Sequence, residues 1–212
     1  MYSKLEVISV AIFIVILSIL ARMSEIIQVV TQRASQWKLL IDEPSNTWEF
    51  STGPGLVLYT GFVRTNATSS DALDCIRIDK AVKSLMNSKL ATTSGWKTDH
   101  SDGVSLSSLV NDPEKPPVSI VIIPQATLSG RLTPGDKYLK YHRQVDRIRS
   151  FQIYCQFIRS ICHFFKFDSV PEDLSSGSTC EIGNLKVTWG SFGKRQGFEL
   201  ISSGPSTHYF EF

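Results

Sequence analysis

The chain of 212 residues lacks the short motifs that mark the common catalytic sites. It has no Gly-x-Ser-x-Gly elbow of serine hydrolases and no His-Glu-x-x-His zinc motif. It also has no phosphate-binding loop and no dinucleotide-binding fingerprint. The few histidines are His100, His142, His163 and His208, and none is paired in sequence with an evident acid and nucleophile. On motifs alone, the chain is interpreted as a binding protein rather than an enzyme.

Cysteine is also scarce. The four cysteines are Cys75, Cys155, Cys162 and Cys180, and no two of them have the Cys-x-x-Cys spacing of a metal site. Cys155 and Cys162 stand at helical spacing, which predicts buried free thiols in a reducing compartment rather than a disulfide framework. We therefore expect no metal, and no motif indicates a cofactor.

A strong excess of charge of one sign is missing as well. The net charge of +2 does not indicate nucleic-acid binding by itself, although an RNA-binding protein needs only a local basic face. Residues 131–149 supply a candidate for such a face, because cations alternate there with aromatic residues, a composition that suits phosphate contact and base stacking. The alternative is an ordinary solvated loop and helix start. The cations are Arg131, Lys137, Lys140, Arg143, Arg147 and Arg149, and between them lie Tyr138, Tyr141 and His142.

The longest hydrophobic run, residues 7–21, is shorter than the roughly 20 residues that a membrane-spanning helix needs. Lys4 precedes the run and Arg22 follows it, so charge does not decide an orientation. Residues 1–22 can be a membrane anchor, a secretory signal, or an extension upstream of a working protein that begins near Met23. We favour the third interpretation and expect one domain over residues 23–212.

The rest of the chain predicts an α+β fold with an antiparallel-rich, curled sheet and two main helices. Helical spacing of apolar residues predicts the two helices. We expect a tight connection at 53–55, a long loop at 92–117 and a polar linker at 170–183. The expected strands are 26–30, 37–41, 47–50, 56–62, 118–123, 185–189, 198–201 and 209–212. The first helix is predicted from Leu73, Ile76, Ala81, Val82, Leu85 and Met86. The second, over 145–165, is predicted from Ile148, Phe151, Cys155, Ile158, Cys162 and Phe165.

One of these strands delivers small and polar residues to its end. The apolar run 118–123 is typical of a buried strand, and Pro124 cannot donate to a ladder. Gln125, Ala126 and Thr127 follow, which suits the floor of a binding site. An ordinary strand end with a turn is the alternative.

Several motifs, in order and spacing, resemble the D-aminoacyl-tRNA deacylase family over roughly residues 24–212. They are Pro-Gln-Ala-Thr-Leu at 124–128, Arg131-Leu132, Tyr141-His142, the stretch 190–196, and Gly-Pro-Ser-Thr-His at 204–208. The closer resemblance is to the animal-type branch, which clears tRNA mischarged with alanine. The resemblance implies a small β-barrel-like fold that acts as a homodimer on aminoacyl-tRNA in the cytoplasm. A membrane is implied only if residues 1–22 are retained as an anchor.

The resemblance also implies roles for individual residues. Gln125, Ala126 and Thr127 would line the catalytic floor, where the family is thought to recruit the 2′-hydroxyl of the RNA instead of a side-chain nucleophile. Substrate binding is implied for Pro124, Gly204, Pro205 and Thr207, with Gly204-Pro205 reaching into the pocket of the partner subunit. Contact with tRNA is implied for Arg131, Lys137, Tyr141 and His142.

The chain departs from the D-specific branch at three positions, Pro124, Ala126 and Ser202, and these favour the branch whose pocket admits a small L-side chain. Gln32-Arg33, in contrast, resembles the Gln-Arg of the D-specific branch, whose arginine is associated with a cis Gly-Pro peptide. A strictly D-selective deacylase therefore stays open as an alternative. So does a catalytically silent tRNA- or membrane-associated binding module.

Overall fold

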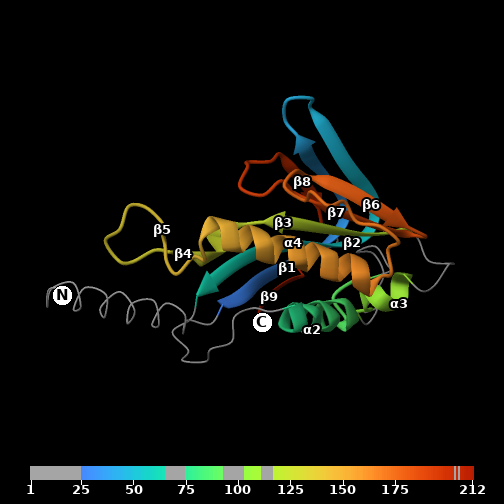
Figure 1. Cartoon of the computed structure of the whole chain (residues 1–212), viewed down its shortest axis with the longest axis horizontal. Helices are drawn as coiled ribbons and strands as arrows, with labels where there is room; N and C mark the ends of the chain where they lie inside the picture. Colours follow the sequence, from blue (N-terminus) through green and yellow to red (C-terminus); the bar gives the residue numbers. More distant parts are fainter. Residues whose placement is uncertain (1–24, 65–74, 93–102, 111–116, 203, 205) are drawn as a thin grey trace, which may run out of the picture.

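The structure, a computed structural model, describes residues 25–64, 75–92, 103–110, 117–202, 204 and 206–212. A seven-stranded sheet in the order β6-β7-β3-β2-β1-β8 forms its centre, and β9 also pairs with β1 (Figure 1). The strands of the sheet are β1 Glu25–Asp42, β2 Thr47–Arg64, β3 Val118–Pro124, β6 Ser178–Ile182, β7 Leu185–Trp189, β8 Phe198–Ile201 and β9 Thr207–Glu211. The helices are α2 Cys75–Asn87, α3 Leu106–Val110, α4 Arg147–Phe164 and the 3₁₀ turn η1 Ala126–Ser129. A separate hairpin pairs β4 Gly130–Arg131 with β5 Lys140–Tyr141.

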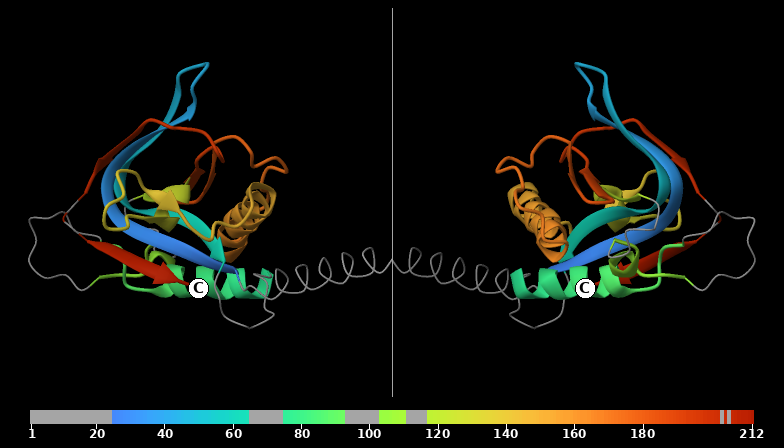
Figure 2. Two further views of the ribbon diagram at one scale, coloured as in Figure 1. Left: turned by 90° about the vertical axis from the view of Figure 1, so that its left-hand side faces the viewer. Right: turned by 90° about the vertical axis from the view of Figure 1, so that its right-hand side faces the viewer.

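The predicted α+β class is confirmed, and the sheet is curled but open. β1 pairs antiparallel with β2, β8 and β9, and β6 pairs antiparallel with β7, whereas β3 lies parallel to both β2 and β7. Figure 2 shows β1 and β2 bending strongly around the body of the molecule. The expected closure of a barrel is not seen in the described part of the chain, because β6 and β8 end the sheet without pairing with each other.

Strands β1 and β2 are each continuous, where the sequence predicted two short strands apiece. The expected tight connection at 53–55 lies inside β2. A Cβ atom on Gly55 would stand 2.3 Å from Ser119 Oγ, and one on Gly53 would stand 2.8 Å from the Pro117 carbonyl oxygen. The glycines therefore serve the close approach of β2 to β3 rather than a turn. A register shift in the ladder with β1 accommodates this stretch.

Strand β3 is buried on both faces, as its apolar run predicted. Ile120 and Ile122 belong to the main core, together with residues of α2 and α4. Val121 faces the opposite way and packs with Trp37, Leu39, Val57 and Ala34. Because both faces are covered, the position of the end of β3 is fixed by the surrounding core.

Both main helices are confirmed, but each has one predicted core residue on its exposed face. Ile76 is 63% exposed and Ile148 is 74% exposed. Leu73, also predicted for the first helix, lies outside the described residues. In α2 the buried face begins at Ile78, which lies at helical spacing from Ala81, Val82 and Leu85. Ile76, two positions earlier, therefore points away from this face. Ile148 lies in the first turn of α4, before the turns whose residues pack in the core.

The predicted linker 170–183 contains a strand, and the predicted loop 92–117 contains a helix. β6 occupies 178–182 and turns back into β7 at Gly183, which has a φ of 57°. Leu174 is buried, so this stretch is anchored to the core rather than free. Helix α3 lies in the second stretch, of which residues 93–102 and 111–116 fall outside the described part.

No helix in the described ranges is long and apolar enough to cross a membrane. The predicted extension 1–22 lies outside those ranges.

Candidate functional site

A turn across the end of β3 forms the floor of the site. Pro124 pairs with Thr60 of β2, and the Gln125 N–H donates to the Thr60 carbonyl oxygen at 2.7 Å. The chain then forms the single 3₁₀ turn η1, in which the Leu128 N–H donates to the Gln125 carbonyl at 3.2 Å. Pro124, Gln125, Ala126 and Thr127 all line one cavity of about 700 Å³. The predicted catalytic residues are thus brought together in a hollow rather than at a plain strand end.

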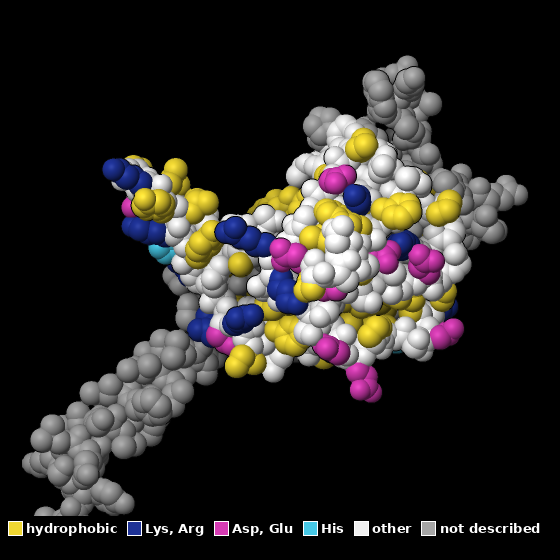
Figure 3. All heavy atoms as spheres, turned by 90° about the horizontal axis from the view of Figure 1, so that it is seen from above, with side chains coloured by type: hydrophobic (Ala, Val, Ile, Leu, Met, Phe, Trp, Pro, Cys, Tyr) yellow, Lys and Arg dark blue, Asp and Glu magenta, His cyan; other side chains and the backbone are white. Residues whose placement is uncertain are grey.

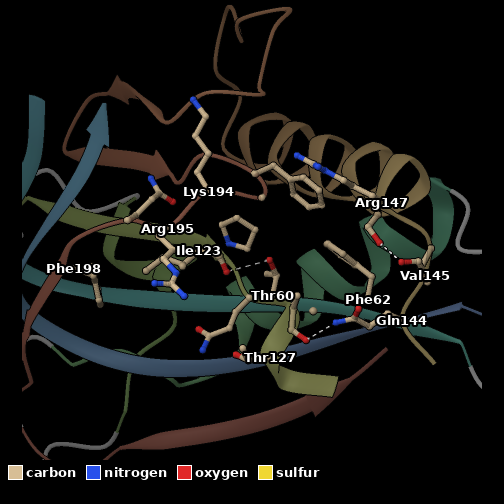
Figure 4. A pocket seen from close by; sticks show the side chains of 18 of the residues that line it. Thr60, Phe62, Ile123, Thr127, Gln144, Val145, Arg147, Lys194, Arg195 and Phe198 are labelled. Carbon is tan, nitrogen blue, oxygen red and sulfur yellow. Dashed lines mark hydrogen bonds between the residues drawn. The ribbon is translucent and has the colours of Figure 1, made fainter. Parts of the chain in front are cut away.

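Two further segments form the walls of this cavity (Figure 4). Helix α4 and the residues before it contribute Val145, Arg147 and Ser150, and the loop after β7 contributes residues 192–196. Leu39, Phe62, Ile123 and Phe198 supply apolar surface from the sheet. A mostly apolar wall with a few polar groups is the usual composition of a site for a small organic group.

Three cations line the cavity from opposite sides. Arg147 lies on the α4 side, and Lys194 and Arg195 lie on the side of the loop after β7 (Figure 4). The two sides meet at Gly193, which has a φ of 72° and stands so near Arg147 that a Cβ atom would lie 3.1 Å from its Nη2. Glycine at this position permits both the backbone conformation and the close approach of the guanidinium. The cavity therefore presents positive charge to an anion at its rim.

A buried tyrosine fixes the two strand ends that carry the floor and the loop. The Tyr154 hydroxyl lies 2.9 Å from the Gly190 carbonyl oxygen and 3.1 Å from that of Ile122. The Gly190 N–H also donates to the Ile122 carbonyl at 2.8 Å. Burial raises the pKa of Tyr154 well above its usual value, so the hydroxyl remains a donor. The ends of β3 and β7 are thereby held side by side.

The carbonyl of Ala126 is held by two side chains. The Gln144 side-chain amide donates to it at 3.0 Å, and the Ser129 hydroxyl donates to it at 2.9 Å. The Gln125 side chain makes no capping bond to η1. The first N–H groups of a helical turn have no partner within the turn, and no hydrogen bond from the Ala126 or Thr127 N–H to another described residue is found.

Among the described residues that line the cavity, there is no Asp, Glu, His or Cys. Two of the hydroxyls are already engaged, since Ser150 donates to the Val145 carbonyl at 3.0 Å and Thr60 to that of Ile123 at 3.4 Å. The Thr127 hydroxyl is exposed and makes no hydrogen bond to another residue of the described chain. The site therefore offers hydrogen-bond donors and cations but no side-chain general base.

The predicted substrate residues Gly204 and Thr207 lie away from this cavity, and Pro205 falls outside the described residues. Gly204 lies in the connection between β8 and β9, and Thr207 is the first residue of β9; both strands pair with β1. The Gln32 side-chain amide donates to Ser202 Oγ at 2.8 Å and to the Gly204 carbonyl at 3.5 Å, and the Thr207 hydroxyl donates to the Gln32 amide oxygen. Gln32 thus links Ser202, Gly204 and Thr207 to β1.

The Arg33 backbone N–H donates to the Ser206 carbonyl oxygen at 3.3 Å, but the Arg33 side chain takes no part in that contact. Its Nε donates to the Leu90 carbonyl oxygen beyond the end of α2, at 2.7 Å. Neighbouring residues of a strand point to opposite faces, which separates Arg33 from Gln32. Among side chains of the Gln-Arg pair, only that of Gln32 therefore contacts the connection between β8 and β9.

The predicted tRNA-binding residues Arg131, Lys137, Tyr141 and His142 all belong to the exposed segment of the β4–β5 hairpin. Figure 3 shows this hairpin standing out from the body, with hydrophobic and basic side chains on its surface. Large apolar side chains are exposed there too, including Leu132, Tyr138 and Leu139. The hairpin leaves the cavity floor at η1 and returns at Gln144, so it is rooted at the edge of the cavity.

Sequence reasoning missed several residues that the fold adds to the cavity. Arg147 was recognised only as one cation of a long cluster, and Lys194-Arg195 only as part of a resembling stretch. No local pattern indicated that Gln144 and Phe62 line the cavity. The other residues of the cavity are distant from them in sequence, and neither residue belongs to a recognisable motif.

Comparison with known proteins gives consistent matches. The family model described as "D-Tyr-tRNA(Tyr) deacylase" matches residues 30–211. The human protein "D-aminoacyl-tRNA deacylase 2" is 32% identical over 158 residues, which are 74% of this chain and 76% of that protein. The Danio rerio protein of the same name is 30% identical over 171 residues, or 81% of this chain and 88% of that protein.

A solved structure described as a probable eukaryotic D-amino acid tRNA deacylase has the same fold. It superimposes with a TM-score of 0.68 at 22% identity and covers 88% of this chain and 100% of its own. The names of the sequence relatives agree with the branch indicated by the Pro-Gln-Ala-Thr-Leu motif. The chain belongs to the D-Tyr-tRNA(Tyr) deacylase family.

Proposed function

We propose that the 700 Å³ cavity is the site at which this chain hydrolyses the ester of a mischarged aminoacyl-tRNA. Its family makes the chain an aminoacyl-tRNA editing hydrolase that cleaves the bond between an amino acid and the tRNA. One observation carries the assignment to this cavity. The residues 124–127, with the Thr127 hydroxyl, and a rim of three cations converge on it, and no Asp, Glu, His or Cys is among the described residues that line it.

The absence of a side-chain base suits this substrate. An aminoacyl ester is intrinsically labile, so the enzyme needs to position it and to stabilise the oxyanion that forms when the carbonyl is attacked. We assign the oxyanion donors to the N–H groups of Ala126 and Thr127 and to the Thr127 hydroxyl. The 2′-hydroxyl of the terminal ribose would orient the attacking water, and the products are the free amino acid and uncharged tRNA.

The positive charges around the cavity suit the tRNA part of the substrate. Arg147, Lys194 and Arg195 would contact the phosphates of the last nucleotides, because they line the cavity that would hold the ester. The β4–β5 hairpin would contact the tRNA farther from the ester. Its cations suit phosphates, and Tyr138 and Tyr141 suit stacking on unpaired bases.

The proposal includes a homodimer. Gly204 is not among the residues that line the cavity of its own chain, and a Cβ atom on it would meet nothing within 4 Å, so the space beside Gly204 is open to an incoming surface. The loop would enter the cavity of a partner subunit, where Gly204 permits a close approach to the amino group of the substrate. Such an enzyme acts where charged tRNA is found, which we take to be the cytosol.

We further propose that the site accepts small side chains, L-alanyl as well as D-aminoacyl. Ala126 is exposed in the cavity and leaves space beside the floor. The strictly D-selective alternative would require a site that excludes the L-alanyl ester.

A panel of charged tRNAs tests the function directly. The full chain should release the amino acid from D-Tyr-tRNA, L-Ala-tRNA and Gly-tRNA faster than buffer does, while a large L-aminoacyl ester remains intact. Activity on D-Tyr-tRNA alone would favour the D-selective alternative. If none of the esters is cleaved although the tRNA binds, the chain is a silent binding module. A version containing residues 23–212 should match the full chain if the extension is dispensable.

Complementation tests the proposed dimer. Thr127→Ala would disable the floor of a subunit, and Gly204→Val would disable the loop that it gives to its neighbour. Mixed subunits should recover activity, because one site of the mixed dimer then contains an intact floor and an intact loop. Full activity of a sedimenting monomer would contradict this part of the proposal.

A further inference from the structure

Two cysteines that are 18 residues apart in the chain meet between α4 and β6. Cys162 Sγ lies 3.8 Å from Cys180 Sγ. Cys162 stands in the last turns of α4 and is fully buried, whereas Cys180 stands in the middle of β6 and is half-buried. No other contact between two cysteine sulfurs is found in the described chain.

The strand alternation of β6 directs Cys180 toward the helix. Cys180 and Ile182 pack against the main core, which contains Cys162. Thr179 and Glu181 point to the other face, where they contact Thr188 and Lys186 of β7. β6 pairs with β7 alone in the described part of the chain, so one edge of the strand that carries Cys180 is not covered by another strand.

The two thiols differ in acidity. The hydrogen bond from Cys162 lowers the pKa of Cys180, because a thiol donor stabilises the thiolate. The pKa of Cys162 is raised, because it serves as that donor and because it is buried. A half-buried thiol whose pKa is lowered by a buried neighbouring thiol is the arrangement of an oxidant-sensitive cysteine and its resolving partner.

We propose that Cys162 and Cys180 form a site of reversible thiol oxidation, at which a peroxide converts the pair into a disulfide that joins α4 to β6. This property is separate from deacylation, because neither sulfur lines the cavity. The sulfurs have to approach by somewhat less than 2 Å to reach the bonded distance of about 2.05 Å.

The chemistry is balanced with hydrogen peroxide as the oxidant. The Cys180 thiolate attacks one peroxide oxygen, the O–O bond breaks, and Cys180 becomes a sulfenic acid as hydroxide leaves. The Cys162 thiol then loses its proton to the hydroxide and attacks the Cys180 sulfur. The S–S bond forms, the S–O bond breaks, and a second hydroxide leaves, which becomes water by taking up the proton that Cys180 released when it ionised. Overall, two thiols and one peroxide give one disulfide and two waters, and two equivalents of an external thiol reverse the change.

The location of the pair gives the crosslink a structural effect. α4 carries Arg147 at its other end, and β6 continues through β7 into the loop that carries Lys194 and Arg195. A disulfide would thus tie α4, which supplies Arg147, to the β6–β7 hairpin, which leads into the loop with Lys194 and Arg195. It would also close a loop in the unfolded chain, which stabilises the folded state.

Mass spectrometry of the full chain tests the proposal. After treatment with hydrogen peroxide under native conditions, the protein should lose the mass of two hydrogen atoms. Digestion without reductant should yield one linked pair of peptides that contain Cys162 and Cys180. The melting temperature should rise, and dithiothreitol should return both the mass and the melting temperature to their starting values.

Matched variants separate this pair from the other thiols. Cys180→Ser should abolish the link and leave the melting temperature insensitive to peroxide, and it changes only a half-buried residue. Cys155→Ser, a buried cysteine of the same helix, and Cys75→Ser, an exposed one, should both retain the link. The proposal is overturned if the native protein yields no linked peptide pair, or if the linked pair joins other cysteines.

Discussion

The side-chain amide of Gln144 donates to the carbonyl oxygen of Ala126 at 3.0 Å. This hydrogen bond links the point at which the β4–β5 hairpin leaves the body to the point at which it returns. The bond holds the floor of the cavity from the side of α4. Through this bond, the end of the hairpin is coupled to η1, whose N–H groups we propose as the donors to the oxyanion. Gln144 is exposed and distant in sequence from this turn, so its contribution depends on the fold.

We predict that Gln144→Leu lowers the single-turnover rate of deacylation by about 10- to 100-fold, because a small displacement of the floor misplaces the donors. Stability should fall by no more than about 1 kcal/mol, since the hydrogen bond that is removed is exposed. Gln152→Leu, at an exposed glutamine of α4, is the matched control and should leave the rate unchanged. If Gln144→Leu reacts at the normal rate, Ser129 alone suffices to hold the floor.

Tyr154→Phe should destabilise the protein by about 1–3 kcal/mol, because the Gly190 and Ile122 carbonyls lose a buried donor. The substitution should also change how the free energy of unfolding depends on pH in the alkaline range. The folded pKa of Tyr154 is raised, so above about pH 10 the unfolded chain releases this proton while the folded chain keeps it, and the free energy of unfolding falls. Denaturant titrations between about pH 8 and about pH 11 should show a smaller fall in the variant.

Part of that fall should remain in the variant. The pKa of Tyr59 is raised by burial, and that of Tyr209 is raised to about 12, chiefly by burial. Both tyrosines therefore contribute a fall of the same sign. Identical slopes in the two proteins would show that Tyr154 is not the residue that resists ionisation.

Apolar periodicity predicted most of the fold because it reports which face of an element is buried. The strand at 118–123 and the helix over 145–165 were found in this way. Gly53-Pro54-Gly55 was misinterpreted because a glycine that permits close strand approach has the same local signature as a turn. Strand β6 was missed because its mixed composition gains stability from pairing with β7, a contact that no local window contains.

The candidate site could be predicted in part. The motif at 124–127 located the floor, since these residues are contiguous and their chemistry is local. The rim could not be found by spacing, because Arg147 and Lys194 converge only when α4 and β7 pack on the same end of the sheet. The proximity of Cys162 and Cys180 was likewise hidden, because it joins a helix to a strand across the turn after α4.

The cationic rim should contribute to the salt dependence of tRNA binding. Lys194→Ala combined with Arg195→Ala should weaken binding and reduce the slope of log Kd against log salt by about 0.7 for each phosphate that the protein no longer neutralises. Lys80→Ala with Lys83→Ala on the exposed face of α2 removes the same charge and should leave the slope unchanged. Filter binding across a salt series measures all of these proteins. Equal slopes in both double variants would show that Lys194 and Arg195 do not contact the RNA phosphates.

The hairpin is tested in the same assay. Arg131→Ala with Lys137→Ala should also weaken binding and flatten the salt dependence, since both residues belong to the exposed hairpin. If affinity and slope stay at their normal values, the hairpin is a solvated surface, whatever the rim contributes.

Thr127→Ala should lower the single-turnover rate by about 100- to 1,000-fold, because a fixed donor acts on charge that develops in the transition state. The affinity for tRNA and the melting temperature should be nearly unchanged, since this hydroxyl makes no hydrogen bond to another residue of the described chain. Thr127→Ser retains the hydroxyl and should recover most of the rate. A variant that loses melting temperature but not rate would show that Thr127 has a structural role only.

Ala126→Phe should narrow the range of substrates. Ala126 lines the cavity and is exposed in it, so a phenyl ring would occupy space beside the bound amino acid. Glycyl esters lack a side chain and should still be cleaved, whereas alanyl esters should be cleaved more slowly. The ratio of kcat/KM for Gly-tRNA and Ala-tRNA is the quantity to measure, because it cancels any general loss of active protein. Ala126→Gly is the control and should leave both esters as substrates. If the ring slows both reactions by the same factor, residue 126 shapes the floor as a whole and does not contact the substrate side chain.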